Sequence, residues 1–299
     1  MPTAGVTIAM LLAGLTLSAG PQFRATSDLV HLPLVALGRD NQPVRGLTAA
    51  DFEVREDGRP QQIAFFVEGA PGVALPLHLG LLLDTSESMT HDLGDSSTAA
   101  IQFVNSLDES IDATLVDFDT TVRVGRFSPA SYPHMFERIR ARKASGMTAL
   151  YDALGEYLAD ATARDGQHVL VIYTDGGDSS SSMTFSQLDQ LLRLSGNVLV
   201  YVIGYLENQR SSDRATQQMR LTAIAHETGA EAYFPSSPKQ VRDIYAKILE
   251  ELSCRYTIGY VPANHATDGR FRKLEVRMVR PDLKGVKIRT RPGYYAPKG

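Results

Sequence analysis

The sequence predicts an α/β protein in which a mainly parallel sheet, with helices on both faces, is inserted into a small β domain. In residues 76–252, short apolar runs alternate with segments of helical spacing, the pattern of a parallel sheet covered by helices. Residues 23–75 and 253–299 carry strand patterns instead. Neither flank alone has enough strands for a stable sheet, so we expect the two flanks to pair into one β domain.

Length and composition indicate a soluble globular chain. Its 299 residues can bury one large core or two modest ones. With 43% hydrophobic residues, 21% charged residues and a net charge of -4, the chain is too balanced for nucleic-acid binding, so we expect no nucleic-acid partner. The single cysteine, Cys254, cannot form an internal disulfide, and we expect it to be a small buried hydrophobe.

The first residues resemble an export signal. Residues 1–20 form an apolar stretch that ends in small residues, although no Lys or Arg precedes it, as one normally does in a signal peptide. A membrane anchor or a buried strand is the alternative, but the run is marginal for a bilayer that needs about 20 apolar residues. We therefore predict a signal peptide, a periplasmic or secreted location and no transmembrane segment in the mature chain.

The strand pattern of the amino-terminal flank has two parts. Residues 29–37 form an apolar run, and residues 52–66 have the pattern of a hairpin. Its turn is Asp57-Gly58, a dipeptide that tolerates positive φ. Before the turn, apolar and charged residues alternate with the period of a half-buried strand. The carboxyl-terminal flank repeats this alternation in residues 274–279 and 286–289.

The central region contains five candidate strands, at residues 78–83, 114–118, 169–173, 198–203 and 231–234. The third and fourth are apolar throughout, as strands covered on both faces should be. Thr184 and Gln187 fit a capping box that begins a helix, and Gly229 fits the left-handed cap of a helix that ends near Thr228.

Oxygen-bearing side chains follow the candidate strands. Asp84, Ser86 and Ser88 come at the end of the first strand, and the carboxyl ends of strands are where open α/β sheets bind ligands. Thr148 opens a helix, and Asp175 follows the central apolar strand. Carboxylate and hydroxyl oxygens without Cys or His suit a hard cation, Mg²⁺ or Mn²⁺.

Three of these segments resemble a known site. DTSES at 84–88, GMTALYDAL at 146–154 and VIYTDGGD at 171–178 are similar, in order and spacing, to the loops of the metal ion-dependent adhesion site of von Willebrand factor A domains. The resemblance implies metal ligands from the first loop, the second loop and the third loop, the last one binding directly or through water. They are Asp84, Ser86 and Ser88, then Thr148, then Asp175.

The same resemblance implies details of the fold. The expected sheet is Rossmann-like and six-stranded, with the order 3-2-1-4-5-6 and one antiparallel edge strand at about residues 121–126. The flanks at 28–66 and 256–297 are similar to those of the von Willebrand factor A-related proteins of Acidobacteria. One departure is Met147, which stands where many relatives have a second glycine and makes the loop backbone more restricted.

The charge of such a site indicates its function. Two carboxylates neutralise a divalent ion, which the resemblance implies is Mg²⁺, with Mn²⁺ or Ca²⁺ as possible substitutes, while neutral hydroxyls leave it electrophilic. We therefore expect a non-enzymatic binding module whose protein partner supplies an Asp or Glu carboxylate. The alternative is a metal-dependent hydrolase that uses the same acidic cluster. G-x-S-x-G, P-loop and H-E-x-x-H motifs are absent from the sequence, which favours binding.

Other polar residues near these loops have simpler interpretations. We expect Asp152 to hold local helix structure, and Glu87 and Asp178 to be solvated. The serine run at 179–182 is expected to be a flexible loop beside the site.

Overall fold

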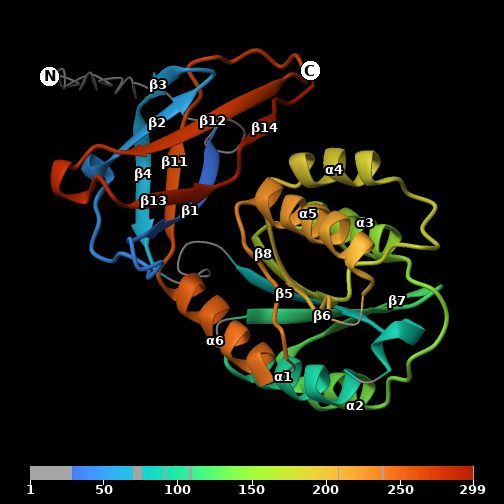
Figure 1. Cartoon of the computed structure of the whole chain (residues 1–299). Coiled ribbons are helices and arrows are strands. Elements are labelled where there is room, and N and C mark those ends of the chain that lie inside the picture. Colours follow the sequence, from blue (N-terminus) through green and yellow to red (C-terminus); the bar gives the residue numbers. More distant parts are fainter. Residues whose placement is uncertain are drawn as a thin grey trace, which may run out of the picture.

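The computed structural model describes residues 29–69, 76–90, 92–107, 110–207, 209–237 and 239–298. A β domain built from both flanks lies beside an α/β domain built from the middle of the chain (Figure 1). The predicted signal peptide, residues 1–20, lies outside the described residues. Among the described helices, none has the length and apolar character needed to cross a bilayer.

The α/β domain is built on a six-stranded sheet with the order β10-β9-β8-β5-β6-β7. Neighbouring strands are parallel except β6 and β7, which are antiparallel. Numbered within the domain, the order is 3-2-1-4-5-6, so the expected topology and the antiparallel edge strand are confirmed. The strands are β5 (Leu77–Asp84), β6 (Ser110–Phe118), β7 (Val122–Phe127), β8 (Gln167–Thr174), β9 (Val198–Gly204) and β10 (Ala232–Tyr233).

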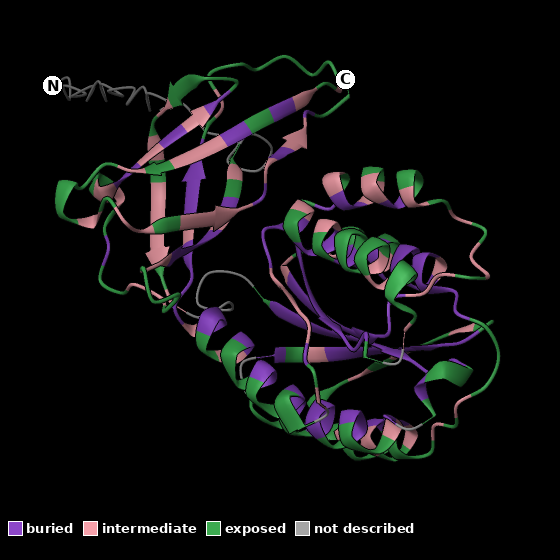
Figure 2. Cartoon of the chain, in the orientation of Figure 1, coloured by how far each residue is buried: buried purple, intermediate pink, exposed green. Residues whose placement is uncertain are grey.

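Helices cover both faces of this sheet, with buried residues toward it and exposed residues away from it (Figures 1 and 2). One face packs against α1 (Leu93–Asn105), α2 (Tyr132–Arg140) and α6 (Lys239–Ser253). The other face packs against α3 (Leu150–Thr162), α4 (Phe185–Leu194) and α5 (Ser211–Thr228). Two helices begin and end as predicted: the Thr184 hydroxyl accepts from the Gln187 N–H, and Gly229 has a φ of 80°.

The β domain consists of two four-stranded sheets that share one core. Each sheet combines strands of both flanks: β1 pairs with β11, and β2 pairs with β12. The predicted pairing of the two flanks is therefore confirmed. The first sheet holds β13 (Lys287–Thr290), β1 (Val30–Leu37), β11 (Tyr256–Tyr260) and β4 (Ile63–Glu68). The second holds β14 (Gly293–Tyr295), β12 (Phe271–Met278), β2 (Phe52–Glu56) and β3 (Arg59–Gln61).

The predicted hairpin at 52–66 is wrong in its second half. β2 and β3 form a hairpin around Asp57 and Gly58, both with positive φ. After Gln61, however, the chain leaves this sheet, and β4 pairs with β11 in the other one. An alternating pattern shows which side chains are buried, but it does not show which strand is the neighbour.

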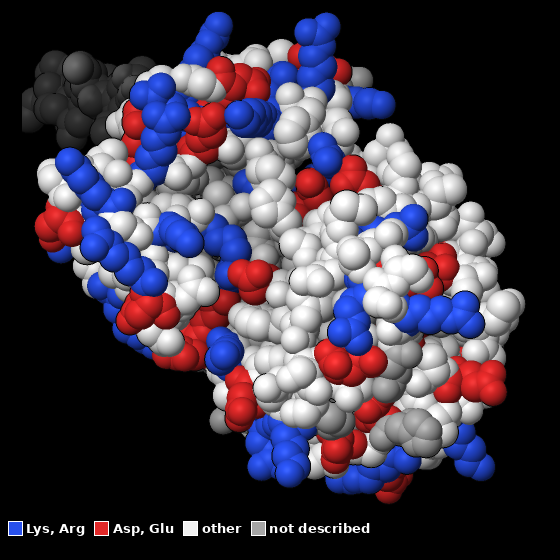
Figure 3. All heavy atoms as spheres, viewed as in Figure 1, with Lys and Arg blue, Asp and Glu red and all other residues white. Residues whose placement is uncertain are grey.

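Short 3-10 helices complete the described elements. They are η1 (Ala49–Asp51), η2 (Glu87–Met89), η3 (Pro129–Ser131) and η4 (Pro281–Leu283). On the face seen in Figure 3, basic and acidic side chains are interspersed over both domains, which agrees with the balanced composition.

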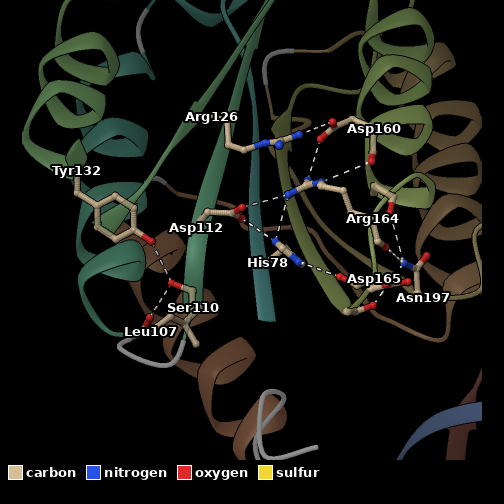
Figure 4. A network of polar contacts seen from close by, with 12 residues as sticks. His78, Leu107, Ser110, Asp112, Arg126, Tyr132, Asp160, Arg164, Asp165 and Asn197 are labelled. Carbon is tan, nitrogen blue, oxygen red and sulfur yellow. Dashed lines mark hydrogen bonds and ion pairs between the residues drawn. The ribbon is translucent and has the colours of Figure 1, made fainter. Parts of the chain in front are cut away.

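Paired polar groups close the amino-terminal edge of the central sheet (Figure 4). The Asp112 carboxylate lies 2.9 Å from His78 Nδ1 and 3.2 Å from Arg164 Nη1. His78 Nε2 lies 3.0 Å from the carbonyl oxygen of Asp165, which can only accept, so this nitrogen carries the proton. Charges at this edge are compensated within the chain.

Gly229 tests the packing between the two domains. A Cβ at this position would lie 2.8 Å from the Thr290 carbonyl carbon, and the backbone is left-handed. We expect Gly229→Ala to lower the free energy of unfolding, measured by urea denaturation, by about 1–3 kcal/mol. The control is Gly46→Ala, because Gly46 also has a left-handed backbone but nothing within 4 Å of its added Cβ, so this substitution should cost less. Equal effects of the two substitutions would contradict this packing.

His168 tests the buried sheet edge through pH. Its ring stacks on His78 at 4.5 Å between centroids, and burial lowers its pKa to about 4. As pH falls from 6.5 toward 4, the unfolded chain binds the proton first, so stability is lost in that window, by about 3 kcal/mol at most. Thermal unfolding should show this loss in the native chain and in the exposed-site control His134→Gln, but not in His168→Leu. The same loss of stability at acid pH in His168→Leu would refute the assignment of this loss to His168.

Candidate metal centre

The five candidate ligands lie at the opposite, carboxyl edge of the sheet. Asp84 ends β5, Ser86 precedes η2, Ser88 lies within η2, and Asp175 comes directly after β8. Thr148 lies two residues before α3. Backbone hydrogen bonds hold the first loop against the second, because the Glu87 N–H donates to the Gly146 carbonyl oxygen at 3.2 Å.

Asp84 is a buried carboxylate with hydrogen bonds but no ion pair among the described residues. Its Oδ1 accepts from the Ser86 N–H at 2.9 Å, and its Oδ2 accepts from the Thr174 hydroxyl at 2.6 Å. Burial raises the pKa of Asp84 to about 6, against these two hydrogen bonds, and the charge of Asp175 raises it further. Two carboxylates therefore act on each other here, and a cation between them would relieve this cost.

The hydroxyls of the first loop have a spacing that suits a small ion. Ser86 Oγ and Ser88 Oγ lie 3.1 Å apart, the first buried and the second exposed. Neighbouring ligands of an octahedral Mg²⁺ at about 2.1 Å are separated by about 3 Å. Both oxygens fit one such ion, with one side reachable from solvent.

The other two candidates are held by neighbours of their own. The Thr148 N–H donates to Ser179 Oγ at 3.0 Å, and its carbonyl oxygen accepts from the Ser179 N–H at 2.9 Å. Asp175 Oδ2 accepts from Gln209 Nε2 at 2.7 Å. The structure thus links Asp84 to Ser86, and Ser86 to Ser88, by hydrogen bonds, and it links Asp84 to Asp175 by charge. Thr148 is bonded to the third loop and forms no hydrogen bond with the other candidates among the described residues.

Two residues at the centre were missed in the sequence. Thr174 donates to Asp84 from the neighbouring strand, and it could have been found because it directly precedes Asp175 in the quoted motif. Gln209 holds Asp175 from a segment 34 positions away, and no local pattern points to it.

The serine run is bonded to the start of α3. Ser181 Oγ accepts from the first N–H groups of this helix at 3.1 Å and donates to Asp178 Oδ1 at 2.6 Å. Asp178 itself accepts from the Tyr151 N–H at 3.2 Å, so this half-buried residue also caps the helix, a role that the sequence did not predict. The Asp152 carboxylate accepts from two N–H groups at the end of the run, which confirms its expected role in local structure. Because Ala149 offers no side-chain cap, the third loop supplies one.

The candidate ligands are oxygen donors, which suit a hard cation better than a softer one. In the described parts of the chain, no group of three or more His, Cys, Asp and Glu side chains is placed to hold a metal. An ion at this edge would rest on two carboxylates and neutral hydroxyls. Oxygen donors of this kind suit Mg²⁺, Mn²⁺ or Ca²⁺.

Comparison with known proteins identifies the family. Residues 78–247, more than half of the chain, match the von Willebrand factor type A domain family, and the chain belongs to it. No curated protein matches the chain.

Two similar solved structures support the same fold. A von Willebrand factor type A protein from Catenulispora acidiphila is 13% identical with a TM-score of 0.50, over 92% of this chain and 75% of that one. The pilus adhesin SpaC from Lactobacillus rhamnosus GG, in an open conformation, is 9% identical with a TM-score of 0.52, over 88% of this chain and 49% of that one. At these identities the likeness shows the fold alone.

Thr174 tests how far hydrogen bonding supports the buried Asp84. Thr174→Val leaves a buried carboxylate oxygen without its donor and the Gly176 N–H without its acceptor. With chelator present, we expect the free energy of unfolding in urea to fall by about 1–3 kcal/mol. Thr114→Val is the matched control, because its buried hydroxyl has no partner among the described residues and its loss should be neutral. A harmless Thr174→Val would contradict this role.

Proposed function

We propose that this chain is a non-enzymatic, divalent-cation-dependent binding module that takes an Asp or Glu of a protein partner. Mg²⁺ is the proposed cation, with Mn²⁺ or Ca²⁺ as substitutes. The proposed ligands are Asp84, Ser86, Ser88, Thr148 and Asp175.

One observation carries the proposal: the Asp84 carboxyl group is buried near Asp175, with no basic side chain paired to either in the described residues. Burying a carboxylate without a counter-charge is costly. At the amino-terminal edge the comparable Asp112 is paired with Arg164 and His78. The carboxyl edge has the charge arrangement that a bound cation would complete.

The chain's own residues set what such a site can do. Thr174 and Gln209 fix one oxygen of each carboxylate, so the remaining oxygens keep their directions. The two serine hydroxyls are neutral, and the exposed Ser88 leaves the site open to solvent. A bound cation would supply Lewis acidity toward an oxygen ligand from outside. A partner carboxylate has the charge and the oxygen that fit this position.

The placement of the histidines supports binding over hydrolysis. His78 and His168, the pair that the sheet buries, lie at the amino-terminal edge, away from the candidate centre. The carboxylates at the centre are engaged by hydroxyl and amide donors, which leaves them poorly placed as a general base. The hydrolase alternative therefore has no supporting observation.

We also propose that the chain works outside the cytoplasm. The apolar segment at residues 1–20 supports export, and a binding module for acidic protein surfaces is compatible with a periplasmic or secreted location.

Calorimetry of the full chain tests the cation site. Titration with MgCl₂ should show one site in the native chain and none in Asp84→Ala, because that substitution removes the central carboxylate. Asp282→Ala, at an exposed position of the β domain, is the control and should bind as the native chain does. Unchanged Mg²⁺, Mn²⁺ and Ca²⁺ binding by Asp84→Ala would reject the site.

Capture from envelope extract tests the function of that site. A partner retained by the native chain should be released by chelator and should not be retained by Asp84→Ala. Metal-dependent hydrolysis of p-nitrophenyl esters or phosphates that also required Asp84 would replace binding with the hydrolase function.

A further inference from the structure

A pocket of about 430 Å³ adjoins the candidate metal centre. Two of its lining residues belong to the metal loops: Thr85 lies between Asp84 and Ser86, and Ser145 directly precedes Gly146. The Ser145 N–H donates to the Thr85 carbonyl oxygen at 2.8 Å. The pocket and the metal centre therefore share a wall made by the first two loops.

Basic side chains outnumber acidic ones in this pocket. Asp117 accepts from the Nε atoms of Arg123 and Arg138 at 2.7 and 2.8 Å. Asp119 accepts from Arg123 Nη2 at 2.8 Å. These two aspartates neutralise the two arginines. Two further cations line the pocket, and their charges remain in excess: Arg142 and Lys143.

Arg142 has a buried donor that lacks an acceptor. Its Nε donates to the Ile139 carbonyl oxygen at 2.9 Å, and its Nη2 donates to Ser97 Oγ at 2.8 Å. Its Nη1 is buried and has no hydrogen-bond partner among the described residues. Burial lowers the pKa of Arg142 to about 10, although Asp117 and Asp84 act in the opposite direction. A buried guanidinium N–H without an acceptor costs free energy.

Lys143 adds a solvent-facing charge next to Arg142. It is exposed, and within the described ranges it forms no ion pair. An arginine held in place beside a mobile ammonium group suits an oxyanion, because the first gives directed hydrogen bonds and the second gives charge. Asp117 and Asp119 are already paired with the other two arginines, so the pocket keeps a net positive charge that attracts an oxyanion. A carboxylate is the oxyanion that an acidic protein partner supplies.

We propose that this basic pocket is a second subsite for an acidic residue of the partner. It binds a carboxylate other than the one that completes the metal centre. The assignment to the same partner rests on the proposed function. The subsite itself depends on Arg142 and Lys143, and neither is a candidate metal ligand. It therefore binds a carboxylate without a bound metal ion. With this subsite, the chain would prefer a partner that has two acidic residues, one for the metal centre and one for the pocket.

NMR titration of the full chain in chelator tests the subsite. Acetate is the probe, with inorganic phosphate in parallel. Amide signals of residues 142–145 and the Arg142 Nε signal should shift and saturate with acetate, at a dissociation constant of about 1–10 mM, as expected for one small anion. Phosphate should shift the same signals, because the pocket keeps a net positive charge and offers its donors to either oxyanion.

Three variants separate this pocket from a general effect of charge. Lys143→Gln, at an exposed position, should weaken acetate binding about threefold to fivefold. Arg142→Lys keeps the positive charge but loses the planar guanidinium with its paired N–H donors, and it should weaken acetate binding about tenfold. Arg140→Gln is the matched control, because Arg140 is exposed on the same segment and does not line the pocket. It should leave binding unchanged.

The proposal fails if acetate causes no saturable shifts, if phosphate leaves the same signals unshifted, or if Arg140→Gln weakens binding as much as Lys143→Gln. Should Arg142→Lys not fold, Lys143→Gln and its control still decide the matter. Because the titration contains chelator, a negative result leaves the metal-dependent function standing. Loss of that function would likewise leave a positive titration intact.

Discussion

The structure depends on one constraint, which is the burial of the Asp84 carboxylate at the end of a strand that has no exposed residue. All eight residues of β5 are buried, and β6 and β8 flank it in the sheet. The strand therefore delivers a charge to the rim of the sheet while keeping it away from bulk water. Burial disfavours that charge and raises its pKa, and the nearby Asp175 adds to the effect. The hydroxyl of Thr174 and the turn at Ser86 only partly offset this cost.

The two edges of the sheet differ in how their acidic side chains are neutralised. At the amino-terminal edge, Asp112 meets Arg164 and His78, so the charges cancel within the chain (Figure 4). At the carboxyl edge, the acidic pair has no such partner, and a neighbouring pocket has basic side chains in excess. The acidic pair lacks a positive charge, and the neighbouring pocket has positive charge in excess. This arrangement favours a bound cation at the first place and a bound anion at the second. This arrangement of charges supports the proposed recognition of an acidic protein surface.

Much of the fold could be predicted because it follows from burial. Strands such as β8 and β9 are apolar throughout because helices cover both faces, and that pattern is visible in the sequence. The pairing of the flanks also followed, since neither could form a sheet alone. The second half of the hairpin at 52–66 was mispredicted, because β4 has the same alternation whichever sheet it joins.

The site was less predictable than the fold. Asp84 and Asp175 stand at strand ends and Thr148 stands just before a helix, so the sequence places all three at the rim of the sheet, and the resemblance to a known site joined them into one set. Gln209 reaches Asp175 only through the folded chain, and the cap that Ser181 gives to α3 spans 30 residues. Contacts of this kind have no local signature, since they depend on which loops the sheet brings together.

Crystals of the full chain grown with Mn²⁺ and measured at the manganese absorption edge would test the central claim most directly. The account predicts one anomalous peak at the carboxyl edge, within ligand distance of Ser86 Oγ and Ser88 Oγ and beside Asp84. A map without a peak there, or with the ion held by other residues, would contradict it.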